Sequence, residues 1–405
     1  MMTELSQFDD YASTTTHLAE IFRSLKNGKE FHHPLLDRLK LDNTKGPALI
    51  FDIDLIGQRM QWLNKLSAQM AITPLLAVKS CPEFQYLEMA NKYLCGYDVS
   101  NAREYGCLPD NLEGKLVSIT SPDLCDDISD FVARGNSAVI TLDSQTQLNQ
   151  YFGQKVPIPY MLRIQGPELL NNIDSSDPAH RPESRFGFTI EEIQQLLKTP
   201  ALCKNPPHGF HVHHGSERNR ASTYRAIIRG LKILIEQQHL EPKFINLGGG
   251  WHNMDREGII KVLGEARQAF PAPCAILLEP GRWYAENTGF AVGTIVNQTL
   301  AADTVKYTVN LSRECHLRWS KVKLIFPVYA SAKKVRKVQF FGPSCYEDDR
   351  IGSFLLPYHD DFLTESGFTP GQRVVFSGVS TYSVALNRSF NGIPKADVSW
   401  CSETK

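Results

Sequence analysis

The stretch Leu75-Leu76-Ala77-Val78-Lys79-Ser80 decides the expected fold, because four apolar residues run directly into a single lysine. Such a run is typical of a buried β-strand. An ammonium at its end is costly unless it pairs with a carboxylate, reaches solvent or serves a chemical purpose. Burial favours the neutral amine, which can attack a carbonyl. Lys79 is therefore a candidate reactive amine, although many lysines in such a position simply end a strand at the surface.

Similar apolar bursts recur along the chain and are separated by amphipathic, helix-like segments such as Tyr224–Gln237. Alternating strand and helix predicts a parallel sheet, and about eight such units are typical of a closed (β/α)8 barrel of the TIM type. An open doubly wound sheet is the alternative. The expected strands are Leu75–Val78, Gly96–Val99, Leu116–Thr120, Ala138–Leu142, Tyr160–Ile164, Gly209–His213, Phe244–Leu247 and Ala275–Leu278.

The polar residues favour the barrel, because they gather at the carboxyl ends of the expected strands. In a (β/α)8 barrel these ends form one rim, and that rim carries the active site. The residues in question are Lys79, Asp98, Arg163, His213, Gly248, Gly249, Gly250 and Glu279.

We expect three parts in the chain. Residues 1–45 are predicted to be a helical lead-in that packs with the C-terminal domain, because apolar residues such as Leu18, Phe22 and Leu25 have helical spacing. Residues 46–288 are assigned to the barrel. Residues 289–405 are assigned to a β domain, in which the expected strands are Gly289–Asn297, Val305–Leu311, Val338–Phe341 and Arg373–Ser377.

Composition narrows the function classes. The 405 residues carry a formal net charge of -1, which argues against nucleic acid or an anionic membrane surface as partner. Nine cysteines at irregular spacing, with no C-x-x-C pair, favour neither a disulfide framework nor a zinc site. The first residues have no signal-peptide pattern and no apolar run is long enough to span a bilayer. We therefore expect a cytoplasmic protein.

Two glycine-containing motifs and a histidine cluster carry possible chemistry. Gly248-Gly249-Gly250 follows a strand and exposes backbone N–H groups, which suit a phosphate, although for these glycines alone a tight turn before a helix is the better explanation. Glu279-Pro280-Gly281-Arg282 places an acid and an arginine at the same rim. His211 and His213 would face the same way on their strand, and because no acidic residue completes a ligand set we expect no metal.

Seven motifs in this order resemble the fold-type III pyridoxal-phosphate decarboxylases, which include ornithine, diaminopimelate and carboxynorspermidine decarboxylases. The resemblance runs from about residue 47 to about residue 392. It implies a barrel with a C-terminal β domain, as in alanine racemase. The motifs are Ala77-Val78-Lys79, Gly96-Tyr97-Asp98-Val99-Ser100, His213-x-Gly-Ser216, Gly248-Gly249-Gly250, Glu279-Pro280-Gly281-Arg282, Gly342-Pro343-Ser344-Cys345 and Phe390-Asn391-Gly392.

The resemblance implies a role for each matched residue. Lys79 would hold the aldehyde of pyridoxal 5'-phosphate as a Schiff base, and Glu279 would keep the pyridine nitrogen protonated so that the ring draws electrons. His213 would stack on the ring, and Asp98 and Arg163 would lie beside the ring and the lysine. Glu104 matches a further acidic position near the site. The residues that would hold the phosphate are Ser216, Gly249, Gly250, Arg282 and Tyr382, and Gly248 and Gly281 are further cofactor-binding residues.

Cys345 has two readings. Buried cysteines are most often small apolar residues. In Gly342-Pro343-Ser344-Cys345-x-x-x-Asp349, however, it resembles the loop that a second subunit inserts into the site, where the thiol protonates the reacting carbon after carbon dioxide leaves. The resemblance thus implies a homodimer with shared active sites.

The chain departs from this family where the distal end of the substrate is bound. Ornithine and diaminopimelate decarboxylases have an acid directly after this cysteine, whereas here Tyr346 follows and Asp349 is among the acids that return later. The facing segment supplies Arg313, His316 and Arg318. Arginine pairs with carboxylates in a bidentate way, so we expect a substrate with a distal carboxylate or neutral group, unless these arginines point to solvent.

Three alternatives remain beside this decarboxylase. One is an ordinary ornithine, lysine or diaminopimelate decarboxylase, if an acid near Asp349 turns inward. Another is an amino-acid racemase of the same fold, for which Tyr346 would serve as a base, although Glu279 argues against it. The third is a non-catalytic relative, which the retention of Lys79 and Cys345 disfavours.

Overall fold

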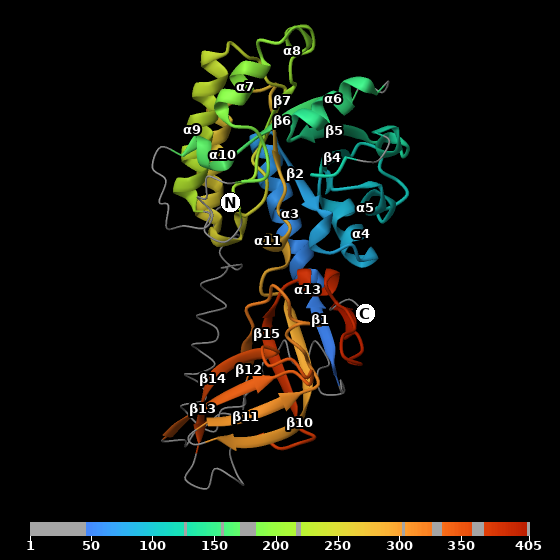
Figure 1. Ribbon diagram of the computed structural model, residues 1–405, viewed down its shortest axis with the longest axis vertical. Helices are drawn as coiled ribbons and strands as arrows, with labels where there is room; N and C mark the ends of the chain where they lie inside the picture. The colour runs from blue at the N-terminus through green and yellow to red at the C-terminus, as the bar shows by residue number, and fades with distance from the viewer. Residues whose placement is uncertain are drawn as a thin grey trace. The chain divides into compact units, whose positions relative to one another are not determined.

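The computed structural model describes residues 46–124, 128–154, 158–170, 184–215, 220–301, 304–325, 334–358 and 368–402. The chain divides into two compact units, which are considered separately below (Figure 1). The barrel unit is Gly57–Tyr284, and the sheet unit combines Met1–Ile56 with Ala285–Lys405. The expected helical lead-in at 1–45 lies outside the described residues.

The barrel unit is built on eight parallel strands that close into a ring, which confirms the (β/α)8 prediction. The ring closes where the first strand pairs with the last, with Ile72 opposite Ile276. The strands in ring order are β2 (Ile72–Ala77), β3 (Gly96–Val99), β4 (Leu116–Thr120), β5 (Ser137–Leu142), β6 (Tyr160–Ile164), β7 (Gly209–Val212), β8 (Phe244–Asn246) and β9 (Ala275–Leu278).

The helices between these strands follow local sequence signals. The helix α9 buries a stripe at helical spacing that includes Tyr224, Ile228 and Leu231, and Asp255 caps the start of α10 by accepting from Gly258 N. The helices are α3 (Ile53–Met70), α4 (Phe84–Tyr93), α5 (Ala102–Gly106), α6 (Gln145–Gly153), α7 (Ile190–Leu196), α8 (Pro200–Lys204), α9 (Ala221–Gln237), α10 (Arg256–Ala269) and α11 (Arg282–Ala285). Short 3-10 turns are η3 (Val78–Ser80), η4 (Ile128–Val132), η5 (Gly166–Leu169) and η7 (Trp251–Asn253).

The interior of the barrel changes from apolar to polar along the strands. Leu75, Val139, Met161 and Leu277 pack together as one buried cluster. Because side chains on a strand alternate between its two faces, residues two positions further on face the same interior. Glu279, two residues after Leu277, therefore lies in the polar layer at the carboxyl ends of the strands, as the sequence indicated.

The sheet unit contains an eight-stranded sheet with the order β12-β15-β10-β11-β13-β14, and β1 joins it beside β10 and β16. Four of these strands were predicted and four were missed, because the missed strands are short or lack a clean alternation of apolar and polar residues. The strands are β1 (Ala48–Asp52), β10 (Gly289–Ala301), β11 (Thr304–Val309), β12 (Lys323–Ile325), β13 (Lys334–Phe341), β14 (Arg350–Tyr358), β15 (Arg373–Val379) and β16 (Asp397–Cys401), and α13 spans Tyr382–Ala385.

The strand β1 corrects the expected boundary at residue 46. It pairs with β10 in antiparallel and with β16 in parallel orientation, and all five of its residues are buried. Residues 46–56 and 285–288 therefore belong to the sheet unit and not to the barrel. The sequence could not place β1, because its partners lie more than 200 residues further along the chain.

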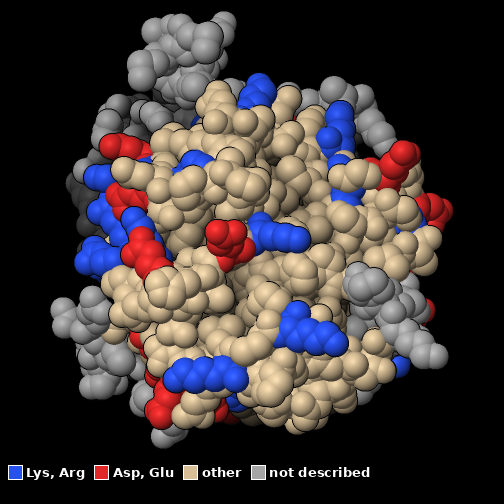
Figure 2. All heavy atoms as spheres, turned by 90° about the horizontal axis from the view of Figure 1, so that it is seen from above, with Lys and Arg blue, Asp and Glu red and all other residues tan. Residues whose placement is uncertain are grey.

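No helix in the described part of the chain is long and apolar enough to cross a membrane. Basic and acidic side chains are interspersed on the face seen in Figure 2, and among the described residues of that face neither sign forms a continuous field. This distribution agrees with the formal net charge of -1.

Candidate active site

Glu279 is the centre of the polar layer at the carboxyl end of the barrel. Its Oε1 accepts from Asn246 Nδ2 at 2.6 Å and from Ser118 Oγ at 3.3 Å, and its Oε2 lies 3.5 Å from His211 Nε2. Burial alone would raise the pKa of Glu279, but His211, Lys79 and the hydrogen bond from Asn246 outweigh burial and hold that pKa below its usual range. Glu279 is therefore a buried, ionised carboxylate.

Two partners of Glu279, His211 and Asn246, come from neighbouring strands in register, and Ser118 comes from β4 across the barrel. Arg163 on β6 lies opposite His211 on β7, and His211 lies opposite Asn246 on β8. The sequence analysis considered His211 only as a metal ligand, which it did not favour, and it did not single out Asn246 or Ser118. Each of these residues lies two positions before a residue at or just beyond the end of its strand, so its side chain faces the interior of the barrel. That they meet at Glu279 is apparent only when the register of the strands is known.

Lys79 follows β2 directly, in η3. Its Nζ lies 3.9 Å from Asp98 Oδ2, and its side chain is 45% exposed whereas that of Asp98 is 2% exposed. Burial and the charge of Glu279 raise the pKa of Asp98 well above its usual range, against the opposing effect of Lys79. Of the two buried carboxyl groups, Asp98 is therefore the one that takes up a proton more readily.

His213 is held as a neutral imidazole. Gly249 N donates to His213 Nδ1 at 3.1 Å, so the ring proton is on Nε2. Burial, together with the positive charges of Lys79 and Arg163, holds the pKa of His213 well below its usual range. The same contact commits the Gly249 amide to His213, which leaves this amide less suited to the phosphate role that the sequence suggested.

Two aromatic residues, Trp251 and Tyr224, hold the triple-glycine turn through hydrogen bonds to its carbonyl groups. Trp251 Nε1 donates to Gly248 O at 2.8 Å, Tyr224 Oη donates to Gly249 O at 2.5 Å, and the two rings stack with centroids 4.2 Å apart. Gly248 has a φ of 63°, and Gly250 has a φ of 92°. Residues other than glycine rarely adopt such positive φ angles. Trp251 is 2% exposed, so its bulk supports the turn.

Arg163 and Glu104 also lie near these groups. Arg163 is buried, and its guanidinium stacks on Phe186, with Cζ 4.6 Å from the ring centroid. Asn101 caps the start of α5 by accepting from Glu104 N through Oδ1, and Glu104 Oε2 in turn accepts from Ser100 N at 2.7 Å.

The expected phosphate ligands are distributed over both units. Arg282 begins α11, directly after Gly281, whose carbonyl accepts from Tyr86 Oη at 3.4 Å. Ser216 lies outside the described residues. Tyr382 begins α13 in the sheet unit, where its ring meets that of Trp319 edge-on at 5.2 Å.

The Cys345 segment of the sheet unit is organised around Asp349, which is 1% exposed. Asp349 Oδ1 accepts from Ser312 Oγ at 3.0 Å and from Arg313 N at 2.6 Å, and Oδ2 accepts from Ser344 Oγ at 2.7 Å. Cys345 itself is exposed. Asp349 therefore ties two loops together and has little capacity left for a substrate.

Two more of the expected substrate residues are also engaged within the sheet unit. His316 is fully buried: its Nδ1 accepts from Ser312 N at 3.1 Å, which leaves Nε2 to donate to Pro394 O at 2.9 Å. Arg313 Nη1 donates to Ser320 O at 2.7 Å. The structure thus corrects the expectation for His316 and Asp349, whose polar atoms hold the loop. Burial of a polar side chain in a loop has no signal in a single sequence.

The remaining two expected substrate residues are accessible. Tyr346 is 50% exposed and its Oη donates to Asp348 Oδ2 at 3.3 Å. Arg318 is 41% exposed, and its Nε lies 3.7 Å from Glu314 Oε2. Arg388, which the sequence analysis did not single out, lies with its Nη2 also 3.7 Å from Glu314 Oε2.

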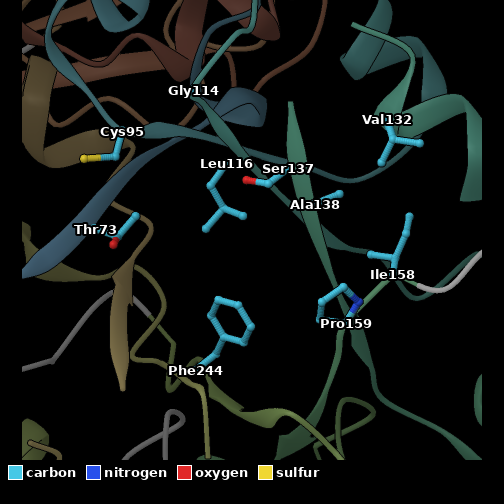
Figure 3. Close-up of a pocket in the computed structure, with 10 residues that line it drawn as sticks. All are labelled: Thr73, Cys95, Gly114, Leu116, Val132, Ser137, Ala138, Ile158, Pro159 and Phe244. Carbon is cyan, nitrogen blue, oxygen red and sulfur yellow. The ribbon is translucent and has the colours of Figure 1, made fainter. Parts of the chain in front are cut away.

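A hollow of about 520 Å³ in the barrel unit is not part of this site (Figure 3). Its lining includes Leu116, Ser137 and Phe244, which are the first residues of their strands. It therefore opens at the amino ends of the barrel, opposite the layer that contains Glu279. Among the described residues, no group of three or more His, Cys, Asp or Glu side chains is placed to hold a metal ion.

Comparison with known proteins assigns the chain to a family. Residues 54–286 match the model of the pyridoxal-dependent decarboxylases, pyridoxal binding domain. The chain belongs to this family and is a pyridoxal-phosphate-dependent amino-acid decarboxylase, that is, a carboxy-lyase.

Individual relatives are distant but cover most of the chain. A chloroplastic ornithine decarboxylase of Nicotiana glauca is 23% identical over 87% of this chain and 83% of its own length. A carboxyaminopropylagmatine decarboxylase of a Synechocystis species is 22% identical, over 89% and 90%. The arginine decarboxylase of Paramecium bursaria Chlorella virus has a TM-score of 0.74 at 19% identity, over 90% of this chain and 99% of its own. The last likeness shows a common fold.

The residues at the rim fit the cofactor of this family. A Cβ atom added to Gly249 would lie 2.9 Å from Glu279 O and 3.2 Å from the His213 ring, so only glycine allows this close approach. Asp98 Oδ1 and His211 Nδ1 are buried without a hydrogen-bond partner among the described residues. Buried polar atoms of this kind usually have a partner, and a polar heteroaromatic phosphate would supply groups of the required type.

Proposed function

We propose that Lys79 is the lysine that carries pyridoxal phosphate, and that the α-carboxylate of an amino acid is lost at the rim beside it. The observation that carries this proposal is the placement of Lys79 and Glu279 after the neighbouring strands β2 and β9. Lys79 Nζ is accessible and lies near a buried carboxyl group, Asp98. An accessible amine that can lose its proton to a neighbour is suited to form a covalent bond with an aldehyde.

When bound, pyridoxal phosphate supplies a protonated pyridine ring that withdraws electrons from the α-carbon of the substrate. Glu279 would hold the proton on the ring nitrogen. Its own hydrogen bonds keep it ionised in a buried place, where a carboxylate attracts a proton on a neighbouring base strongly. Asn246 and Ser118 act by fixing the direction of this carboxylate.

Three other groups would hold and orient the cofactor. The neutral ring of His213 offers a flat face without a charge that would repel a cationic pyridine. Arg282 and the backbone N–H of Gly250 are suited to a phosphate, because guanidinium and backbone N–H groups donate to its oxygens, whereas Gly248 N and Gly249 N already donate to Asn246 and His213. Asp98, whose pKa is raised by burial and by Glu279, can exchange a proton with Lys79 Nζ.

We further propose that the enzyme works as a homodimer in which Cys345 of one subunit serves the site of the other. Cys345 is an exposed thiol, and Asn391 Oδ1 fixes its backbone by accepting from Cys345 N at 2.8 Å. A thiol held in this way can deliver a proton to the α-carbon after carbon dioxide has left. Its exposure within one chain agrees with a role toward a second subunit.

For the substrate, we propose an α-amino acid whose distal end is negative or neutral. Tyr346 stands at the position after Cys345, where a neutral side chain cannot neutralise a distal ammonium. Arg318 lies on the accessible side of the adjoining loop. A distal ammonium would meet a positive charge here, and the desolvation of the ammonium would be uncompensated.

Borohydride reduction of the cofactor-loaded enzyme, followed by peptide mapping, tests the first proposal. We expect the adduct on Lys79, and an adduct on another lysine would refute the assignment. Carbon dioxide release from L-ornithine, L-lysine and their distally acylated derivatives tests the substrate class. Release from free ornithine with kcat/KM of about 10⁴ M⁻¹s⁻¹ or above would overturn it.

A further inference from the structure

Two arginine side chains of the sheet unit converge on one carboxylate, that of Glu314. Arg318 Nε and Arg388 Nη2 each lie 3.7 Å from Glu314 Oε2, and Arg388 Nε donates to Glu314 O at 3.3 Å. The two segments are joined by a backbone hydrogen bond from Arg388 N to Cys315 O at 3.2 Å. One negative charge thus faces two positive charges, and this cluster of three keeps one positive charge in excess.

The exposure of this cluster argues against a purely structural role. The Arg318 side chain is 41% exposed and the Arg388 side chain 49%, whereas Glu314 is 26% exposed. Ion pairs as exposed as these contribute little to stability, because water and salt screen them. A guanidinium has five N–H donors in a planar fork, and the one hydrogen bond among these contacts is that from Arg388 Nε to the backbone carbonyl of Glu314, since the two contacts to Glu314 Oε2 are ion pairs at 3.7 Å.

The cluster is tied to the segment that contains Cys345. Asp349 accepts from Glu314 N at 3.4 Å through Oδ1 and from Ser344 Oγ at 2.7 Å through Oδ2. A second link runs through Asn391, which lies three residues after Arg388 and whose Oδ1 accepts a hydrogen bond from Cys345 N. Two links therefore connect the segments of Glu314 and Arg388 to the segment that contains Cys345.

The pKa of Tyr346 relates Glu314 to the same segment. The neighbouring charge and hydrogen bond of Asp348 raise the pKa of Tyr346, and Glu314 contributes to this rise in the same direction. Glu314 therefore lies within electrostatic reach of the position that follows Cys345.

We propose that Arg388 and Arg318 together bind a carboxylate at the distal end of the substrate, with Glu314 as the positioning residue that holds the two guanidiniums toward one point. This inference rests on the proposed function, in which the Cys345 segment serves the reacting site. The substrate is then an α-amino acid extended by an acidic group, such as a diamino acid whose distal amine is acylated by a dicarboxylic acid. The single excess positive charge matches a carboxylate better than a phosphate dianion.

Matched ligands separate charge recognition from shape. Nδ-succinyl-L-ornithine and Nδ-butanoyl-L-ornithine have acyl chains of equal length and differ in a terminal carboxylate against a terminal methyl group. Their amine products, N-succinylputrescine and N-butanoylputrescine, are not turned over, so calorimetric titration of the cofactor-loaded enzyme measures their binding directly. The variants are Arg388→Gln and Arg318→Gln, and Lys337→Gln removes a cation from an exposed position on β13 as the control.

We expect the wild-type enzyme to bind the succinyl product, and to use the succinyl substrate, about tenfold to hundredfold better than the butanoyl counterparts. This is the range that charge-assisted hydrogen bonds contribute. Arg388→Gln and Arg318→Gln should each remove most of this preference, mainly through KM, while butanoyl values stay within about threefold. Lys337→Gln should retain the preference.

Equal binding of the two products by the wild-type enzyme would overturn the inference, and so would an Arg388→Gln variant that weakens both ligands alike. These outcomes are distinct from a failure of the proposed function. If the succinyl product binds preferentially but neither the acylated substrates nor ornithine release carbon dioxide, the proposed reaction fails and the carboxylate site stands.

Discussion

Gly249 N donates a hydrogen bond to His213 Nδ1 at 3.1 Å, and this single contact fixes the tautomer of the ring. A histidine that accepts from a backbone N–H through Nδ1 has its proton on Nε2, and protonation at Nδ1 would break the bond. The glycine turn and the histidine at the end of β7 are therefore one unit in both geometry and protonation.

This relationship predicts that His213 stays neutral well below pH 6.5. Burial, with Lys79 and Arg163, lowers its pKa in the folded state. Because the unfolded chain takes up a proton more readily, the contribution of His213 to stability is present above about pH 6.5 and is lost as the pH falls. Long-range ¹H–¹⁵N spectra of histidine-labelled enzyme should show the Nε2–H tautomer at both pH 7.5 and pH 6.0. An imidazolium pattern at pH 6.0, absent from His213→Gln, would contradict this prediction.

Glu279→Gln should retain bound cofactor but lose most decarboxylase activity. A neutral amide cannot hold the proton on the pyridine nitrogen, and Asn246 would lose a charged acceptor. The loss of one buried charged hydrogen bond corresponds to roughly a hundredfold or more in kcat. Glu265→Gln makes the same chemical change on α10, where Glu265 pairs with Arg225 at 3.0 Å, and should leave kcat unchanged. Cofactor content is measured by absorbance. A Glu279→Gln variant whose kcat is within about threefold of the wild-type value would refute the role of Glu279.

Mixing two inactive variants tests the shared sites. Lys79→Ala and Cys345→Ala chains, exchanged at equal ratio, should recover about a quarter of the wild-type sites, because random pairing gives half heterodimers with one intact site each. Each variant measured alone, as Lys79→Ala or as Cys345→Ala homodimers, provides the blank. If verified exchange restores no activity, the site is built within one chain.

The contribution of Glu286 to stability should depend on pH in the opposite sense to that of His213. Burial raises its pKa to about 7, against Lys321 and Lys323. The folded state therefore holds a proton that the unfolded state has lost, and stability falls as the pH rises from about 4.5 through about 7. Glu286→Gln should unfold at a higher temperature than wild type at pH 8 and at a similar temperature at pH 5. The exposed substitution Glu347→Gln should show no such divergence, and parallel curves for Glu286→Gln and wild type would refute the prediction.

The barrel could be predicted because each of its strands has its own local signal, an apolar burst that ends in a polar residue. The strand β1 has the same kind of burst, but its partners β10 and β16 are set by long-range pairing, so it was placed in the wrong unit. Register explains the missed site residues in the same way. His211 and Asn246 become partners of Glu279 only when neighbouring strands are aligned.

The loop residues show the other limit of the sequence. Arg313, His316 and Asp349 were grouped because they follow or face the Cys345 segment along the chain. In the structure His316 and Asp349 are buried and bonded within the loop, whereas Arg388 lies beside Arg318 from a distant segment. Which polar side chain turns inward depends on hydrogen-bond partners that are far apart in sequence.

Asp348 and Asp349 form a matched pair for the last prediction, because they are adjacent carboxylates with opposite surroundings. Asp349 is buried and accepts from Ser312 Oγ, Arg313 N and Ser344 Oγ. Asp348 is exposed and accepts from Tyr346 Oη at 3.3 Å. Asp349→Ala should lower the free energy of unfolding by about 2–4 kcal/mol, because these three donors and Glu314 N, in and around a buried site, lose their acceptor.

Asp348→Ala should change the same quantity by less than about 0.5 kcal/mol, as exposed substitutions usually do. Urea unfolding followed by tryptophan fluorescence measures both, since Trp319 lies on the loop that Asp349 holds. Asp349→Ala should also reduce activity more than its stability loss explains at temperatures where it remains folded, because Ser344 and the adjoining Cys345 lose their anchor. Equal effects of the two substitutions on stability would mean that Asp349 does not hold the loops together.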